Sequence, residues 1–277
     1  MRAALLQSCT GIDPAAGRAV LADAIAEAGR AGAHMLFTPE MSGFLDRDKQ
    51  RASAHLAPER EDRTLAAVRE AAARTGIWVH LGSLALRSDD PAEPRLVNRG
   101  FVIDATGAIR ARYDKIHLFD VDVPGGVRWR ESESYAPGSR AVVVDVPDGR
   151  LGLSICYDVR FPDLYSALAQ AGAQILSIPA AFTVPTGRAH WHVLLRARAI
   201  ETGSWVIAAA QSGLHEDGRS TYGHSLVVDP WGNVVLDMED EAGIAYAEID
   251  LGQGDEVRAQ IPVLRHRRTI GEVEIAR

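Results

Sequence analysis

The sequence lacks several features that would assign it to a specialised class of protein. Two cysteines in 277 residues are too few for a disulfide-stapled secreted fold, and their scarcity favours a reducing cytoplasm. No apolar run approaches the length of a membrane-spanning helix. A net charge of −7 argues against a nucleic-acid or anionic-membrane partner. Low-complexity tracts and charged blocks are also missing, so we expect one domain over residues 1–277.

Lysine is almost absent as well. The chain contains only Lys49 and Lys115, against 28 arginines (30 minus 2). Lysine carries a compact charge on a flexible stem, whereas arginine presents a wide planar fork. Lys49 lies in a polar stretch that is typical of a surface. Lys115 precedes an apolar segment, which indicates a narrow pocket that requires one ammonium group.

Segments with strand and helix character alternate along the chain. We expect strands at 3–8, 35–38, 78–85, 96–103, 108–113, 141–146, 151–155, 174–178 and 205–210, and helices at 14–31, 60–75, 162–171 and 190–202. This alternation predicts a layered α/β fold. Turn signals, including one at 230–233, predict hairpins and therefore sheets that are not purely parallel.

Cys156 lies in the segment L-G-L-S-I-C-Y-D-V-R-F-P, between an apolar strand and a helix that Pro162 is suited to open. We expect the positive end of that helix to favour the thiolate. Buried structural cysteines are common. The residues that follow Cys156 are polar, however, which is unlike the composition of a hydrophobic core and favours a nucleophile. Cys9, at the end of the first strand, is interpreted as a small core residue.

Two similar segments within the chain differ at Glu40. Residues 31–40 (A-G-A-H-M-L-F-T-P-E) and 171–180 (A-G-A-Q-I-L-S-I-P-A) share five identities in ten. The first copy ends in Glu40 and the second in Ala180. The repeated unit therefore does not itself require a carboxylate, which indicates a functional role for Glu40.

Together, Cys156, Lys115 and Glu40 suit the hydrolysis of an amide. A thiolate attacks the carbonyl, and Lys115 and the backbone N–H of Tyr157 stabilise the oxyanion. Glu40 moves the proton from the thiol to the departing nitrogen, and then activates water to release the acid. This chemistry needs no metal and no cofactor. Two alternatives stay open: a thiol protease that uses His117, and a non-enzymatic scaffold.

Other conspicuous residues have structural interpretations. His190 is expected to cap or pack at a helix start, and His224 to be buried and hydrogen-bonded. Asp120 and Asp122 lack partners at metal-ligand spacing, so a solvated loop is expected. Three tryptophans are expected in the core: Trp191, Trp205 and Trp231.

The chain resembles the nitrilase superfamily of carbon–nitrogen hydrolases. The matching segments are F-T-P-E-M, Y-D-K-I-H-L-F-D and S-I-C-Y-D-V-R-F-P. The resemblance implies a four-layer αββα sandwich and a catalytic triad of Glu40, Lys115 and Cys156. The segment R-E-S-E-S-Y-A-P-G resembles the one that carries a second active-site glutamate, here Glu131. Relatives pair through a helical layer, so the resemblance also implies a homodimer or larger assembly.

Within the superfamily, the Nit branch is the most similar. The segments R-A-R-A-I-E-T and Y-G-H-S-L-V-V-D-P-W-G resemble those of deaminated-glutathione amidases. The resemblance implies substrate contacts at Arg160, Phe182 and Thr186, beside Tyr157. It also implies a small carboxylate-bearing amide as substrate, namely deaminated glutathione. The alternative is an ω-amidase that acts on 2-oxoglutaramate. The tail R-R-T-I-G-E departs from the usual R-R-P-D-L-Y, which leaves the C-terminal contacts open.

Overall fold

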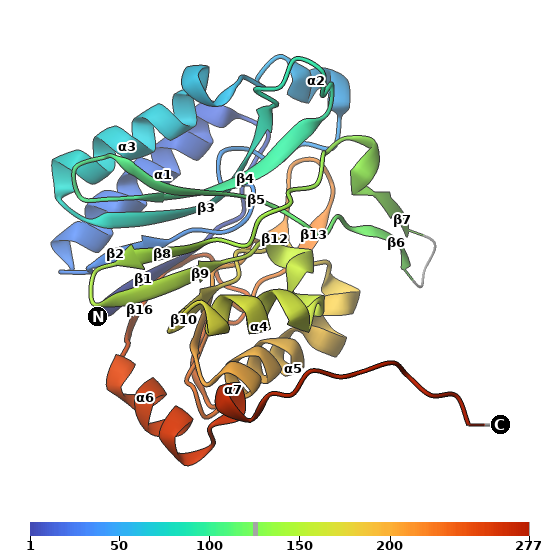
Figure 1. The fold of residues 1–277 in the computed structure, drawn as a ribbon. Helices are drawn as coiled ribbons and strands as arrows, with labels where there is room; N and C mark the ends of the chain where they lie inside the picture. Colours follow the sequence, from blue (N-terminus) through green and yellow to red (C-terminus); the bar gives the residue numbers. More distant parts are fainter. Residues whose placement is uncertain (124–126, 277) are drawn as a thin grey trace.

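Two six-stranded sheets lie face to face at the centre of the computed structural model, which describes residues 1–123 and 127–276 (Figure 1). The first sheet has the order β16 (Gly243–Glu248), β1 (Arg2–Gln7), β2 (Met35–Phe37), β3 (Trp78–Arg87), β4 (Leu96–Ile103), β5 (Ile109–Asp114). The second has the order β15 (Val234–Asp237), β14 (Leu226–Val228), β11 (Trp205–Ala208), β10 (Ile175–Ser177), β9 (Gly149–Leu153), β8 (Val143–Val146). Both sheets mix parallel and antiparallel pairs, as the turn signals predict.

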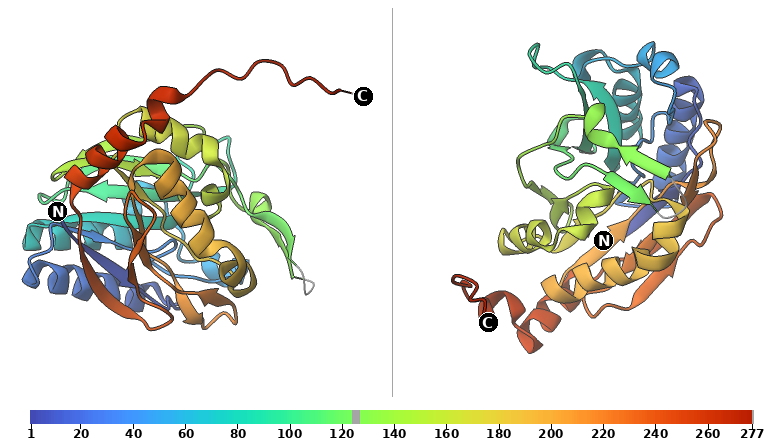
Figure 2. Two further views of the ribbon diagram at one scale, coloured as in Figure 1. Left: turned by 90° about the horizontal axis from the view of Figure 1, so that it is seen from below. Right: turned by 90° about the vertical axis from the view of Figure 1, so that its right-hand side faces the viewer.

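Helices cover the outer face of each sheet. The pair α1 (Pro14–Arg30) and α3 (Arg63–Thr75) lies over the first sheet, and the pair α4 (Pro162–Gln170) and α5 (Val184–Thr202) lies over the second (Figures 1 and 2). The order helix, sheet, sheet, helix confirms the predicted αββα sandwich. After α6 (Leu251–Gln260) and α7 (Val263–His266), the C-terminal segment runs away from the body (Figure 2).

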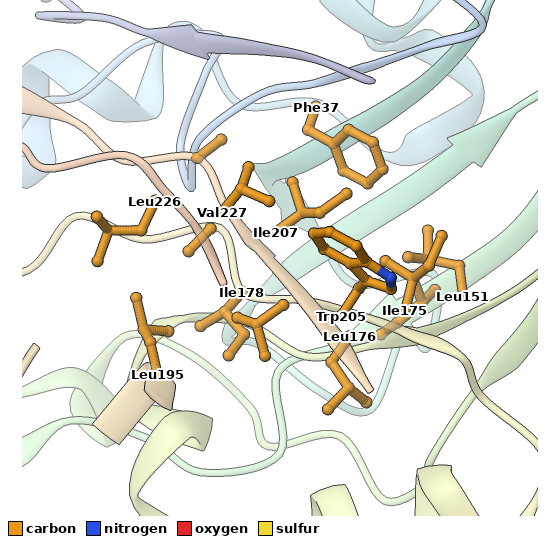
Figure 3. Close-up of a cluster of buried hydrophobic side chains, with 14 of the residues drawn as sticks. Phe37, Leu151, Ile175, Leu176, Ile178, Leu195, Trp205, Ile207, Leu226 and Val227 are labelled. Atoms are coloured by element: carbon orange, nitrogen blue, oxygen red, sulfur yellow. The ribbon is translucent and has the colours of Figure 1, made fainter. Parts of the chain in front are cut away.

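Strand alternation divides the apolar residues between two cores. In β1, Ala3 and Leu5 pack between the sheets, whereas Ala4 and Leu6 pack toward α1 and α3. This is the two-residue period of a strand that is buried on both faces. Figure 3 shows the core between the sheets, where Phe37 of β2 faces Ile207 and other labelled side chains of the second sheet.

Local signals explain where the main helices begin and end. Asp13 and Asp62 accept hydrogen bonds from Ala15 N (2.8 Å) and Leu65 N (2.7 Å), and so cap α1 and α3. Gly76 ends α3 with φ of 71°, a left-handed conformation in which glycine has no steric penalty. Pro14 and Pro162 begin α1 and α4, as the sequence predicts.

Several expectations are wrong in detail. Helix α5 begins at Val184 and not at residue 190, because a proline in the first turn needs no donor there. His190 therefore lies in the second turn and does not cap the helix. Cys9 lies beyond the last residue of β1 and is exposed, so it is not a core residue. Trp231 is 51% exposed, since it lies in the turn between β14 and β15.

The sequence analysis does not predict several short elements around the sandwich, because none is long enough to show the hydrophobic period of a helix or a strand. They are α2 (Lys49–Ser53) and two hairpins, β6 (Asp120–Val123) with β7 (Val127–Arg130) and β12 (Ser212–Leu214) with β13 (Ser220–Tyr222). Asp120 and Asp122 belong to β6, not to a loop. Within the described ranges, no helix combines the length and apolar character that crossing a bilayer requires.

Candidate active site

Four charged or nucleophilic side chains meet at one end of the two sheets. Glu40 follows β2, Lys115 follows β5, Glu131 begins a 3₁₀ turn (Glu131–Glu133), and Cys156 begins another (Cys156–Arg160). Lys115 Nζ lies 3.0 Å from Glu40 Oε1, and 3.0 and 2.9 Å from the two oxygens of Glu131. The structure thus brings together the four residues that the sequence analysis selects as catalytic.

The turn at Cys156 is strained and firmly held. Cys156 has φ of 51°, a left-handed conformation that is uncommon for a side chain other than glycine. Its N–H donates to Pro179 O at 2.8 Å. The fully buried Asp158 accepts from Ile155 N, from the Tyr113 hydroxyl (2.7 Å) and from His117, which fixes the residues after the nucleophile.

The sequence analysis expected a helix N-terminus to stabilise the Cys156 thiolate, and the structure does not place one at the sulfur. Helix α4 begins at Pro162, six residues beyond Cys156, so its N-terminus does not hold the sulfur. Burial and the negative charge of Glu40 raise the pKa of the Cys156 thiol well above its ordinary value, although Lys115 opposes this. The resting Cys156 side chain is therefore a thiol, and any reaction through its sulfur must remove that proton.

The two partners of the thiol are shifted toward their charged forms. Burial would raise the pKa of Glu40, but Lys115 and several hydrogen bonds outweigh it and hold the pKa below its ordinary value. Burial would lower the pKa of Lys115, but Glu131 and Glu40 raise it well above its ordinary value. At neutral pH the site therefore holds a carboxylate that can accept a proton beside a permanent ammonium group.

Backbone groups complete this arrangement. Glu40 Oε2 accepts from Ala181 N at 3.0 Å, and Glu131 Oε2 accepts from Phe119 N at 2.6 Å. Among the described residues, the Tyr157 N–H has no hydrogen-bond acceptor, so it can donate to an oxyanion beside Cys156.

A cavity of about 890 Å³ opens onto these groups. Tyr157, Phe182 and Thr186 line it together with Glu40, Lys115, Glu131 and Cys156. Arg160 is not among the lining residues. Its guanidinium carbon lies 5.4 Å from the ring centroid of Phe182 and 5.9 Å from that of Tyr157, and it contacts His190. The cavity volume lies within the roughly 300–1,000 Å³ range of small-molecule sites.

The histidines of the chain serve other contacts. His117 Nδ1 lies 2.7 Å from Asp158 Oδ1, and its ring stacks on Phe161 at 3.6 Å. In the described part of the chain, neither His117 nor His190 lines the cavity. His224 is partly buried and bonds to Asp237, in line with its structural interpretation.

His224, His192 and Asp237 form a separate group in which the ligand atoms lie within 4.8 Å of one another, a spacing that a metal ion can accept. None of the three lines the cavity. His192 Nε2 lies 3.0 Å from Asp237 Oδ2 and His224 Nδ1 lies 2.9 Å from Asp237 Oδ1, so each contact is already explained by a hydrogen bond.

The sequence analysis does not select Asn98, which joins the two glutamates. Asn98 Nδ2 lies 2.8 Å from Glu40 Oε1 and 3.4 Å from Glu131 Oε1, while its Oδ1 is buried without a partner among the described residues. The available signal was an asparagine, next to Arg99, inside the largely apolar strand L-V-N-R-G-F-V-I. An asparagine there is uncommon unless its amide has a defined partner.

Comparison with known proteins gives a consistent result. The family model described as carbon-nitrogen hydrolase matches residues 2–259. A deaminated glutathione amidase of Yersinia enterocolitica is 39% identical over 271 residues, which cover 98% of this chain and 94% of that protein. The nitrilase and fragile histidine triad fusion protein NitFhit of Caenorhabditis elegans is 46% identical over 247 residues, 88% of this chain. The chain spans 56% of that fusion protein.

Solved structures agree with these relatives. The crystal structure of C. elegans NitFhit superimposes with a TM-score of 0.87 at 42% identity, over 96% of this chain and 65% of that one. Nit3 of Saccharomyces cerevisiae, described as a member of branch 10 of the nitrilase superfamily, gives a TM-score of 0.85 at 28% identity over 97% of both chains. These matches confirm the resemblance to the nitrilase superfamily and its Nit branch.

The position of Asn98 predicts a shift in pH dependence. Its hydrogen bond helps to hold the pKa of Glu40 below the ordinary value of 4.5. Asn98→Leu should therefore raise that pKa, and the acid limb of kcat/KM for amide hydrolysis should move to higher pH, since the deprotonated carboxylate is the active form. Leucine is nearly isosteric and removes the unpartnered Oδ1, so the variant should fold. A slower variant with an unmoved acid limb would give Asn98 a packing role only.

Proposed function

Because the chain belongs to the carbon–nitrogen hydrolase family, we propose that it is an amidase with Cys156 as nucleophile, Glu40 as general base and acid, and Lys115 as the cation beside the oxyanion. The observation that carries this assignment is the placement of these three groups and Glu131, from four separate segments, on the wall of one cavity. A scaffold without catalytic activity has no need for such an arrangement.

The reaction proceeds through a thioester. Glu40 takes the thiol proton as the Cys156 sulfur bonds to the amide carbonyl carbon, and the carbonyl electrons move onto oxygen. Lys115 Nζ and the Tyr157 N–H stabilise that oxyanion. Glu40 then gives the proton to the departing nitrogen as the carbon–nitrogen bond breaks. Water attacks the thioester with Glu40 as base, which releases the carboxylic acid and restores the thiol.

Glu131 has a different role from Glu40 in this proposal. Both of its oxygens contact Lys115, and Phe119 N–H adds a third contact. Glu40 is hydrogen-bonded to the Cys156 thiol, whereas Glu131 is not, so Glu131 is less suited to carry the thiol proton. It orients the Lys115 ammonium, so that its charge points to the place where the oxyanion forms.

Deaminated glutathione is the proposed substrate, and the relatives that bear this activity in their names support it. Deaminated glutathione carries a 2-oxo group where glutathione carries an amine. Arg160 supplies a positive charge behind the cavity rings of Tyr157 and Phe182, which attracts the 2-oxo carboxylate and repels an ammonium. Thr186 adds a hydroxyl in the cavity wall. 2-Oxoglutaramate is the alternative substrate, and it would fill less of the 890 Å³ cavity.

The proposal includes a homodimer or larger assembly in the cytoplasm. Val193 (68% exposed) and Ile200 (52%) project from α5, and Trp231 (51%) lies at the β14–β15 turn. Apolar side chains in such a group favour an interface between subunits. The two unpaired cysteines suit a reducing compartment.

A substrate panel tests the proposed activity. We expect kcat/KM for deaminated glutathione to exceed that for 2-oxoglutaramate by roughly tenfold and that for glutathione by far more, since a charge mismatch is rejected more strongly than a size mismatch. The measurement is 2-oxoglutarate release from the first two and glutamate release from the third. Similar turnover of glutathione and its deaminated form would contradict the substrate, whereas a strong preference for 2-oxoglutaramate would make the protein an ω-amidase.

Removal of the nucleophile should abolish turnover and spare the fold. Cys156→Ala leaves a small residue at the turn, and Cys156→Ser should also be nearly inactive because a hydroxyl is a much weaker acid. Intact-mass measurement of the wild-type enzyme quenched during turnover should detect an acyl adduct on Cys156, with Cys9→Ala as the matched control. An adduct that maps to Cys9 would refute the assignment.

A pair of variants separates this mechanism from a cysteine–histidine one. Lys115→Arg keeps the charge, but the larger planar fork does not fit between Glu40 and Glu131, so kcat should fall by roughly a hundredfold or more. His117→Ala should lose stability through Asp158 but keep most of its kcat per folded molecule. If thermal unfolding shows that His117→Ala is folded yet inactive while Lys115→Arg is active, the cysteine–histidine alternative replaces the triad.

A further inference from the structure

Five arginines line the cavity, and three of them are occupied by protein partners. Arg87 donates to backbone carbonyls of Leu56 and Ser53, Arg95 forms a two-pronged pair with Glu93, and Arg130 pairs with Asp122 and two carbonyls. Arg47 and Arg219 remain. A guanidinium group has five donors, so the number already used decides whether it can bind a ligand.

Arg47 and Arg219 are placed around one buried carboxylate. Asp217, which is fully buried at its side chain, accepts from Arg47 N at 2.9 Å, from Arg219 N at 3.1 Å and from Arg219 Nε at 2.7 Å. Arg219 Nη2 lies 2.7 Å from the same Oδ2 atom. Among the described residues, Arg219 Nη1 and the whole Arg47 guanidinium have no hydrogen-bond partner, so both side chains keep free donors.

An aromatic row connects this pair to the reaction centre. Arg219 lies 5.7 Å from the ring centroid of Trp129, Trp129 lies 6.4 Å from Phe119, and Phe119 lies 5.0 Å from Tyr157, the neighbour of the nucleophile. All three rings line the cavity. Arg160 lies at the other end of the row, 5.9 Å from Tyr157. The row of rings in the cavity wall therefore ends at Arg219, which lines the cavity, and has Arg160 behind its other end.

We propose that Arg219, with Arg47, binds a second carboxylate, located on the leaving-group side of the scissile amide. This inference rests on the proposed function and specifies its substrate class: an extended 2-oxo amide with a carboxylate at each end. A dipeptide leaving group spans about 7 Å when extended, more than the 5.0 Å between the Tyr157 and Phe119 rings, so its terminal carboxylate can extend along the row toward Trp129 and Arg219. The buried Asp217 holds the Arg219 fork in place, so that little side-chain entropy is lost when the carboxylate binds.

The positive pair also explains how a larger substrate is preferred over 2-oxoglutaramate. That amide releases ammonia and has nothing that reaches Arg219. Deaminated glutathione releases a dipeptide with a terminal carboxylate, and a hydrogen bond to a charged group contributes about 1.5–3 kcal/mol, or roughly 10- to 100-fold in binding. Arg219 thus acts on specificity, whereas the groups around Cys156 act on both substrates alike.

Three substrates and three variants test this inference. The substrates are deaminated glutathione, the same compound with its terminal carboxylate converted to a carboxamide, and 2-oxoglutaramate. The variants are Arg219→Gln, Arg219→Lys and Arg30→Gln, the last an exposed arginine of α1 as the matched control. The wild type should prefer the carboxylate over the carboxamide by roughly tenfold or more in kcat/KM, chiefly through KM. Higher salt should reduce this preference.

In Arg219→Gln the preference for the carboxylate over the carboxamide should disappear, and kcat/KM for 2-oxoglutaramate should fall much less than that for deaminated glutathione. Arg219→Lys should retain part of the preference, because it keeps the charge but loses the fork, and Arg30→Gln should match the wild type. Equal losses on all three substrates, or an unchanged preference in Arg219→Gln, would overturn the subsite alone. If the wild type hydrolyses none of the three, the proposed function fails and the subsite fails with it.

Discussion

The site depends on the ion pairs that the buried Lys115 ammonium forms with Glu40 and Glu131. The Lys115 side chain is 3% exposed, and it contacts both carboxylates within 3.0 Å. Removing one member of a buried ion pair leaves the other without compensation, at a cost of about 3–5 kcal/mol. The arrangement also fixes the protonation pattern. The ammonium between two carboxylates keeps Glu40 ionised, and burial together with the charge of Glu40 keeps the neighbouring thiol protonated.

The layered fold explains how residues so far apart in sequence reach one place. The similar segments 31–40 and 171–180 occupy equivalent places in the two halves of the fold. The first follows α1 and contains β2 of the first sheet, and the second follows α4 and contains β10 of the second sheet. The chain after each strand turns toward the other sheet, and Glu40 Oε2 accepts from Ala181 N across the junction. Each half therefore contributes what the other lacks: a carboxylate from the first, and the cysteine turn with its backbone donors from the second.

Alternating strand and helix segments predicted a layered α/β fold, because apolar periods are local signals. The resemblance carried by short motifs implied the four-layer sandwich and the grouping of Glu40, Lys115, Glu131 and Cys156. The sequence analysis missed what depends on packing at a distance. The role of Asn98 is visible only once the fold brings β4 to Glu40 and Glu131, and that of Arg219 only once the β12–β13 hairpin lies beside Trp129. Trp231 and Cys9 were wrongly assigned to the core, since composition does not reveal which residue lies at an exposed turn.

The protonated resting state of Cys156 has a consequence for oxidative damage. Peroxides react with thiolates much faster than with thiols, and burial further limits their access. In the proposed mechanism Cys156 ionises only as Glu40 takes its proton, so the sulfur is shielded from sulfenic acid formation between turnovers. Such an enzyme can work in a cell under oxidative stress without a resolving cysteine beside its nucleophile, and Cys9, which is exposed on another part of the chain, is the sulfur more open to modification.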